Sequence, residues 1–272
     1  AAATAMAAAR SGPPPLDLTV KPGVDAAALA RAIGGEIMPT GTVRRAEIGA
    51  VEGLPGFAAG DWWVQDAAAA LPVRLLKPRP GEIVADLCAA PGGKTLQTAA
   101  SGATTLAVEA SAKRLRRVEA NLQRTGLTAQ LITADAVSWR PDGPLNAVLL
   151  DAPCTATGTL RRRPDTAFAK QDGDIASLAR IQDALLDSAA EMVKPGGRIV
   201  YCTCSLEREE GEERIAAVLD RRSDLRRDPV AEGELPGLGE AITSNGAVRT
   251  RPDMWAERGG LDGFYMARLI KA

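Results

Sequence analysis

The stretch DLCAAPGGKT, residues 86–95, contains the small-residue turn that decides the fold assignment. It continues the apolar run EIVADL, and the residues from Lys94 onward have the composition of a helix. A strand, a turn of small residues and a helix in that order are typical of the first unit of a parallel α/β sheet, where ligands bind beyond the carboxyl ends of the strands. The same letters also resemble a triphosphate-binding loop, which reads G-x-x-x-x-G-K-[ST].

Two residues of this turn favour a ligand other than a triphosphate. Cys88 stands where the triphosphate loop has its first glycine, and Pro91 lacks a backbone N–H. A triphosphate cradle needs several backbone N–H groups that point inward. We therefore expect a different ligand, and an ATPase stays as the alternative that the ending Gly93-Lys94-Thr95 leaves open.

Strand and helix patterns alternate along the rest of the chain. The apolar runs include TTLAVEA, QLITAD, LNAVLLDAP and RIVYCTCS, and helical patterns lie between most of them. This alternation predicts a doubly wound, mostly parallel, Rossmann-like α/β sheet with helices on both faces. Asp61 is expected to cap a helix that reaches Leu76 and that Pro72 divides.

The region before this sheet has a different pattern. Residues 15–58 contain several short strand patterns and one helix that Asp25 can cap, and they predict a small α/β N-terminal module. Residues 59–272 are expected to form the main domain. Residues 1–14 are rich in Ala and Pro, and we expect a linker or the edge of a chain that extends further upstream.

The composition excludes several classes of protein. Hydrophobic residues make up 46% of the 272 residues, which is enough for a core, and no apolar run approaches the roughly 18 residues of a membrane-spanning helix. The chain has no His, which excludes catalytic sites that need an imidazole. Four Cys in a chain of this length favour a cytoplasmic thiol protein over a disulfide scaffold. The net charge of −1 does not by itself indicate a nucleic-acid partner.

Acidic residues stand at the ends of three successive predicted strands. Glu109 ends the second strand, Asp135 the third and Asp151 the fourth. An acid at the end of the second strand suits two ribose hydroxyls, as in dinucleotide sites. The row of acids predicts a crevice for a nucleoside and is poorly suited to three phosphates.

Cysteines stand at the ends of two predicted strands that we expect to be neighbours. Cys154 follows the strand that ends at Asp151, whereas Cys202 and Cys204 end the next one and share a face of it. Adjacent strands would bring Cys154 close to this pair. Three interpretations stay open, namely a metal site, inert buried thiols, and a nucleophile at a partly exposed position such as that of Cys204.

Three motifs in order carry a resemblance to a known family. DLCAAPGGKT, DAPCTATG and TCS together resemble the RNA cytosine-C5 methyltransferases of the Sun/Fmu (RsmB) type. The resemblance extends over roughly residues 54–272 and includes LPGF, LRRRPD and GGLDGFYMARL. Three positions depart from the family, which usually has Asp at Glu109 and often has His at Arg163 and Asn at Gly211.

The resemblance implies a cofactor and the residues that bind it. It implies that the main domain is an S-adenosylmethionine-dependent catalytic domain, whose product is S-adenosylhomocysteine. Glu109 would bind the ribose hydroxyls, Asp135 would lie by the adenine, and Asp151 would lie near the methionine end and the target base. The cofactor would lie across the turn formed by Cys88, Ala89, Ala90, Pro91, Gly92, Gly93 and Lys94.

The resemblance also implies a reaction and a partner. Cys204 would be the nucleophile that attacks C6 of cytosine, and Cys154 would assist release of the methylated RNA. Arg161 and Arg162 follow the second motif, and we expect them to bind RNA phosphates. The expected substrate is 16S ribosomal RNA. Transfer RNA and a catalytically silent RNA-binding or ribosome assembly factor are the alternatives. We expect a monomer without a bound metal.

Overall fold

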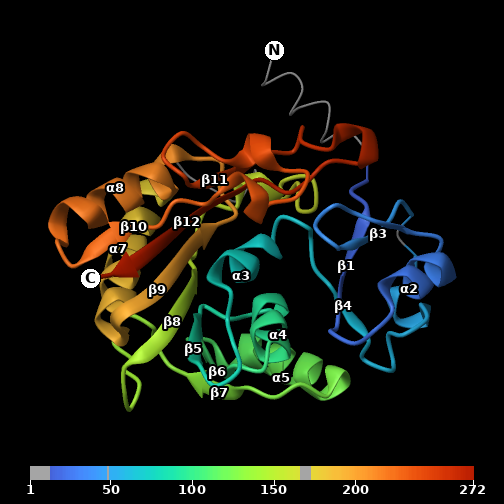
Figure 1. Cartoon of the computed structure of the whole chain (residues 1–272), viewed down its shortest axis with the longest axis horizontal. Coiled ribbons are helices and arrows are strands. Elements are labelled where there is room, and N and C mark those ends of the chain that lie inside the picture. The colour runs from blue at the N-terminus through green and yellow to red at the C-terminus, as the bar shows by residue number, and fades with distance from the viewer. Residues whose placement is uncertain (1–12, 48, 166–172) are drawn as a thin grey trace.

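The computed structural model of the chain describes residues 13–47, 49–165 and 173–272. Its strands form two sheets, a four-stranded one near the N-terminus and an eight-stranded one (Figure 1). The strands are β1 (Leu16–Val20), β2 (Glu36–Ile37), β3 (Val43–Arg45), β4 (Trp62–Val64), β5 (Ile83–Leu87), β6 (Thr104–Glu109), β7 (Gln130–Thr133), β8 (Leu145–Asp151), β9 (Val193–Thr203), β10 (Leu225–Arg227), β11 (Val248–Thr250) and β12 (Phe264–Lys271). The α-helices are α2 (Ala26–Ile33), α3 (Leu71–Leu76), α4 (Gly93–Ala100), α5 (Ala112–Thr125), α7 (Asp174–Met192) and α8 (Glu212–Arg221), and the 3-10 helices include η3 (Arg208–Glu210).

The small sheet is antiparallel and has the order β2-β3-β1-β4. Its helix α2 begins where the sequence predicted, because the Asp25 carboxylate accepts hydrogen bonds from the N–H groups of Ala27 and Ala28. Gly34 ends the helix in the left-handed conformation, with a φ of 66°. The predicted small α/β module therefore forms.

The small module extends beyond the predicted boundary at residue 58. Trp62 and Trp63, in β4, pair with Val20 and Thr19 of β1, and the Trp62 side chain is fully buried in the core of the small sheet. For the same reason the predicted helix from Asp61 is wrong, and a helix begins only at Leu71. The boundary expectation was too early because the partner strand of β4 lies more than 40 residues before it in the sequence.

The large sheet confirms the predicted doubly wound fold. Its order is β10-β12-β9-β8-β5-β6-β7, with β11 paired to β12. The five strands from β9 to β7 run parallel, and β12 pairs antiparallel with β9. The chain leaves β7 and returns to β8, beside β5, so the strand order reverses between β5 and β8. This reversal is where a doubly wound sheet binds ligands.

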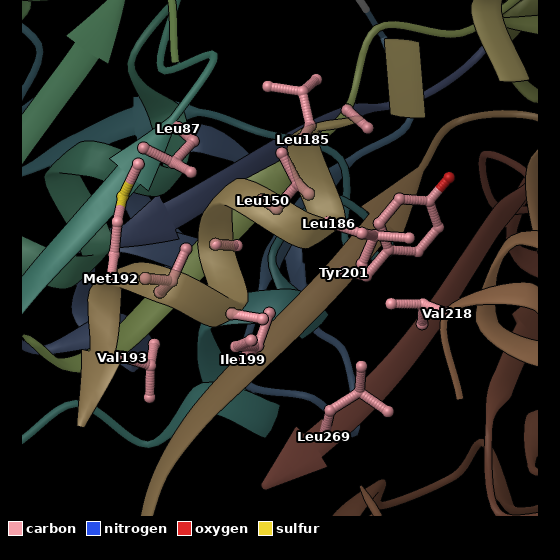
Figure 2. Packing of buried hydrophobic residues seen from close by; sticks show 14 of the residues in the cluster. Leu87, Leu150, Leu185, Leu186, Met192, Val193, Ile199, Tyr201, Val218 and Leu269 are labelled. Atoms are coloured by element: carbon pink, nitrogen blue, oxygen red, sulfur yellow. The ribbon is translucent and has the colours of Figure 1, made fainter. Parts of the chain in front are cut away.

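Alternating side chains of the large sheet pack against helices on opposite faces. Figure 2 shows Leu185 and Leu186 of α7 above Leu150 and Ile199 of the sheet. Side chains of the same strands that point to the other face, such as Leu149 in β8 and Cys202 in β9, belong to a second apolar cluster together with the residues of α3. This alternation decides which cysteines and acids can meet, because Asp151 and Cys202 both point to the α3 face. Among the described residues, no helix has the length and apolar character that a membrane crossing requires.

Candidate active site

The two cysteine segments lie side by side, as the sequence predicted. β8 and β9 are parallel neighbours, and Asp151 pairs in register with Cys202. Beyond the strand ends, the Sγ atoms of Cys154 and Cys204 lie 3.4 Å apart, and both residues are partly exposed. In the part of the chain that the structure describes, no group of three or more metal-ligating acids or cysteines has gathered. The arrangement supplies a pair of accessible thiols at the reversal of the strand order.

The cysteines differ in their protonation. The hydrogen bond with Cys204, together with burial, raises the pKa of Cys154 well above its usual value, so Cys154 keeps its proton and can donate it toward Cys204 Sγ. Burial raises the pKa of Cys202 well above its usual value and that of Cys88 to about 12. The raised pKa makes Cys88, Cys154 and Cys202 poor nucleophiles.

The turn that carries Cys154 is held by backbone contacts to the segment that carries Cys204. The Gly158 N–H donates to the Cys204 carbonyl at 2.9 Å, and the Ala152 N–H donates to the Cys202 carbonyl at 2.9 Å. A Cβ atom on Gly158 would lie 2.0 Å from the Gly263 carbonyl oxygen, so only glycine allows this approach. The thiol pair therefore rests on a packed turn.

Lys94 pairs with Asp151 beside the thiols, a contact that the sequence did not predict. Its Nζ lies 2.8 Å from Asp151 Oδ2, and the Lys94 side chain is buried whereas the Asp151 side chain is 29% exposed. Burial lowers the pKa of Lys94, but the nearby Asp151 carboxylate raises this pKa by more than burial lowers it. The pKa of Lys94 therefore lies above its usual value. Cys202 Sγ donates to the other carboxylate oxygen, Oδ1, at 3.4 Å. The ion pair with Lys94 thus places a partly exposed carboxylate at the site.

The turn after β5 is arranged differently from a triphosphate loop. In a triphosphate loop the hydroxyl of this threonine would bind a metal ion. Here the Thr95 hydroxyl donates a hydrogen bond to Asp86 Oδ2 at 2.6 Å. Burial raises the pKa of Asp86 to about 7. Among the described residues, Asp86 Oδ1 has no hydrogen-bond partner, although it is buried. A buried, unsatisfied carboxylate oxygen suits the amino group of a ligand better than a phosphate.

The two other acids of the predicted crevice lie at the ends of adjacent strands. Glu109 is buried and accepts hydrogen bonds from the N–H groups of Ala90 and Ser111 at 3.3 and 3.0 Å. Arg114 also donates to it, so Glu109 supports the turn itself. Asp135 follows β7, is exposed, and accepts from the Val137 N–H at 2.9 Å. The row of acids forms as predicted, and the specific roles of these two acids remain predictions.

A cavity of about 300 Å³ opens between this turn and the small module. Residues of the predicted cofactor loop line one side of it, together with Asp151, and aromatic residues of the small module line the other. Its lining includes Ala89, Pro91, Gly93, Lys94, Asp151, Phe57, Trp63 and Gln65. Of the acids at the strand ends, Asp151 belongs to this lining, whereas Glu109 and Asp135 do not, so the cavity and those two acids lie on different parts of the predicted crevice.

Burial opposes the predicted RNA-binding role of Arg161, whereas that of Arg162, whose side chain is 26% exposed, stays a prediction. The Arg161 side chain is 0% exposed and pairs with Asp66 at 2.8 Å and with Asp262 at 2.6 Å. Arg162 pairs with the same two acids at 2.7 and 3.0 Å. Each acid lies about a hundred residues from the arginines, and no local pattern indicated the pairing. Both arginines join distant segments of the chain.

Known proteins resemble this chain over most of its length. The family model described as "16S rRNA methyltransferase RsmB/F" matches residues 73–270. The ribosomal RNA small subunit methyltransferase B of Pseudomonas syringae pv. tomato is 42% identical over 81% of this chain and 50% of its own length. The protein of the same name from Vibrio cholerae is 40% identical over 81% of this chain and 49% of its own length. The chain therefore spans about half the length of the curated relatives it matches.

Solved structures resemble the fold. A methyltransferase homolog protein from Pyrococcus horikoshii has a TM-score of 0.81 and 29% identity, and the match covers 99% of this chain and 90% of that chain. NSun6 from the same organism, solved with SFG, has a TM-score of 0.70 and 29% identity over 82% of this chain and 56% of its own. The first match extends over the small module as well as the large sheet.

Proposed function

Because the chain belongs to the RsmB/F family of 16S rRNA methyltransferases, we propose that it is the catalytic part of an S-adenosylmethionine-dependent RNA (cytosine-5)-methyltransferase. The observation that carries the proposal is the 3.4 Å approach of Cys154 and Cys204 beside the Lys94–Asp151 pair. Neither an ATPase nor a passive RNA-binding protein accounts for two facing thiols at the ligand-binding edge of the sheet.

The chemistry needs a nucleophile, because C5 of cytosine is too weakly nucleophilic to take a methyl group. Attack of the Cys204 thiolate on C6 moves the ring electrons toward N3 and makes C5 a carbon nucleophile. The Asp151 carboxylate can accept a hydrogen bond from the N4 amino group and so hold this edge of the base in place while C6 is attacked. The target base has to leave its stack to reach these groups, which is easiest in a looped or single-stranded RNA.

When bound, S-adenosylmethionine supplies the methyl group. The turn from Cys88 to Lys94 would hold it, with Glu109 and Asp135 on the nucleoside side. After transfer, a base takes the C5 proton, the C5–C6 double bond forms again, and Cys204 Sγ leaves as a thiolate. Cys154 retains its proton and lies 3.4 Å from Cys204 Sγ, so it can donate a hydrogen bond to that departing thiolate and assist release.

Two substitutions test this assignment of roles. Cys204→Ala should lose methyl transfer from labelled cofactor to a 16S rRNA fragment, because no thiol can then attack C6. Cys154→Ala should methylate once and accumulate a covalent protein–RNA adduct that survives SDS electrophoresis. Full activity of Cys204→Ala would show that this cysteine is not the nucleophile.

The substrate is proposed from the names of the relatives, all of which act on ribosomal RNA according to those names. Methylation of 16S rRNA fragments and of transfer RNA should be compared with the same enzyme, and bisulfite sequencing would locate the modified cytidine. Preference for transfer RNA would select the alternative substrate. We also infer that the protein acts in the cytoplasm and that it is a monomer. Light scattering of the purified chain would test the monomer by its molar mass.

A further inference from the structure

Glu210 is a buried carboxylate that lies next to the thiol pair and that the proposed mechanism does not use. It ends the short helix η3, six residues after Cys204, and its side chain is buried. One of its oxygens accepts from the Thr155 N–H at 3.0 Å and the other at 3.1 Å, and the Thr155 hydroxyl also donates to it. Thr155 directly follows Cys154, so the carboxylate holds the turn on the C-terminal side of that thiol.

Gln182, from helix α7, holds the other side of the same turn. Its side-chain Nε2 donates to the Pro153 carbonyl at 2.8 Å and to Glu210 Oε1 at 3.1 Å. Its Oε1 is buried without a partner among the described residues. The amide therefore faces the carboxylate as a donor, although this orientation leaves an oxygen unsatisfied. Cys154 is thus placed between two residues that Gln182 and Glu210 fix.

The main chain of Glu210 is in turn fixed to the strand that leads to Cys204. Its carbonyl oxygen accepts from the Tyr201 hydroxyl at 2.7 Å and from Thr203 Oγ1 at 3.3 Å. Tyr201 and Thr203 are in β9, the strand whose end carries the other thiol. A single residue therefore connects the turn of Cys154 to the strand before Cys204.

Among the described residues, the hydrogen-bond donors to this carboxylate are uncharged groups of Thr155 and Gln182, which is an expensive way to bury an acidic side chain. Burial of a carboxylate costs several kcal/mol unless hydrogen bonds compensate for lost hydration. A neutral side chain of the same shape could fill this space, but it could not accept from the Thr155 N–H, the Thr155 hydroxyl and Gln182 together. Because several donors from the Cys154 turn and from Gln182 converge on it, the Glu210 carboxylate fixes the position of that turn.

We propose that Glu210 is a positioning residue that holds the Cys154 thiol against Cys204 for release of the methylated RNA. The inference rests on the proposed function. In the release step the C5 proton passes to a base, its electron pair forms the C5–C6 double bond, and the C6–S bond breaks to return the Cys204 thiolate. Glu210 acts on this step only through the placement of Cys154, whose S–H stabilises that thiolate.

The test compares Glu210→Gln with Glu209→Gln, a change of the same kind at the exposed neighbour in η3. In Glu210→Gln an amide N–H₂ replaces one oxygen and opposes the donors of Thr155 or Gln182. We expect about a tenfold higher fraction of SDS-stable adduct at steady state and about a tenfold lower turnover, with the rate of adduct formation within about twofold of wild type. Glu209→Gln should match wild type in all three.

A merely structural role of Glu210 gives a different pattern. Adduct formation and turnover would then fall together, with no accumulation of adduct, and that result would overturn the proposal. Should Glu210→Gln fail to fold, Thr155→Val decides the matter, because it removes the hydroxyl, with its contacts to Glu210 and to Ser205 Oγ, and keeps the N–H contact. It should raise the adduct fraction by about threefold, on the scale of one neutral hydrogen bond, and an unchanged fraction would overturn the proposal.

Measurements on the wild-type enzyme and on Cys154→Ala distinguish a failure of the proposed function from a failure of the positioning role of Glu210. Absence of 5-methylcytosine with wild-type enzyme would overturn the proposed function. Adduct in Cys154→Ala, but wild-type levels of adduct in both Glu210→Gln and Thr155→Val, would leave the function standing and refute the positioning role.

Discussion

Two clusters of acids and cations contrast within this chain. In the first, Lys94 and Asp151 lie beside the thiol pair, and the Asp151 carboxylate is 29% exposed. In the second, Arg161 and Arg162 lie against Asp66 and Asp262, and Arg161 and both acids are almost completely buried. Asp151 ends β8, and the two arginines follow it by ten and eleven residues, in sequence motifs that both suggested function. Exposure separates Asp151 from Arg161, Asp66 and Asp262, because water reaches the first and hardly reaches the other three, whereas Arg162 is 26% exposed.

The buried cluster also connects parts of the chain that the first does not. Asp66 lies between the small sheet and α3, Asp262 precedes β12, and the arginines belong to the segment after the Cys154 turn. Arg161 further donates to the Gly259 carbonyl, and Asp17 of the small sheet pairs with Arg44, which donates to the Gly260 carbonyl. These contacts join the small module, the C-terminal segment and the active-site turn.

The largest expected effect is on stability, at the buried cluster. Arg161→Met keeps much of the side-chain volume but leaves Asp66 and Asp262 less compensated in the interior. We expect a loss of about 3–5 kcal/mol in the free energy of unfolding by urea denaturation, since breaking a buried ion pair leaves an uncompensated charge. Arg116→Met, at an exposed position of α5, is the matched control and should change stability little. A loss of RNA affinity without a loss of stability would revive the phosphate-binding interpretation of Arg161.

The next effect is on activity, at the exposed cluster. Asp151→Asn replaces the carboxylate that would hold the N4 amino group of the base, and that pairs with Lys94, by a neutral amide, and we expect turnover to fall by about a hundredfold or more. Its stability should fall by less than that of Arg161→Met, because water reaches part of the Asp151 side chain. Single-turnover methylation and urea denaturation on the same preparations would measure both. If activity persisted while stability collapsed, the two clusters would have exchanged roles.

The smallest effect is a dependence of stability on pH. Burial raises the pKa of Asp86 to about 7 and, together with Asp66, that of Asp262 to about 6, from an ordinary value near 3.8. Between pH 5 and 8 the native chain therefore binds protons that the unfolded chain has released, so the free energy of unfolding should fall as pH rises. Each group contributes at most about 1.4 kcal/mol per pH unit, at pH values between its unfolded and its folded pKa.

A matched variant assigns that pH dependence. Asp86→Asn has a neutral side chain of the same shape at every pH, so its stability should fall less steeply between pH 6 and 8 than that of the wild type. Denaturation curves collected across this range would show the difference. An equal slope in the two proteins would mean that Asp86 does not hold a raised pKa.

Much of the architecture could be predicted because its signals are local. The apolar runs, the glycine turn at residues 86–95 and the Asp25 cap each identify an element from a few neighbouring residues. Adjacent parallel strands then predicted that Cys154 and Cys204 meet, since their positions at two strand ends fix the geometry. The reversal of strand order followed from the same alternation of strands and helices.

The remaining contacts depend on partners far apart in the chain. β4 was missed because its identity as a strand comes from pairing with β1. Lys94 and Asp151 are 57 residues apart, and Glu210 reaches Thr155 across 55 residues. Arg161 looked like a surface cation because a run of arginines usually faces water, and only the buried Asp66 and Asp262 reverse that preference. Long-range pairing of charges has no sequence signal comparable to the periodicity of a strand.

The central claim is that Cys204 attacks the base while Cys154 keeps its proton and assists release. The most direct measurement is peptide mass spectrometry of the covalent RNA adduct that Cys154→Ala accumulates, after nuclease and protease digestion. The account predicts a cytidine-derived mass, with its methyl group, on the peptide that contains Cys204. The same mass on Cys88 or Cys202, or no adduct on any cysteine of an active enzyme, would contradict it.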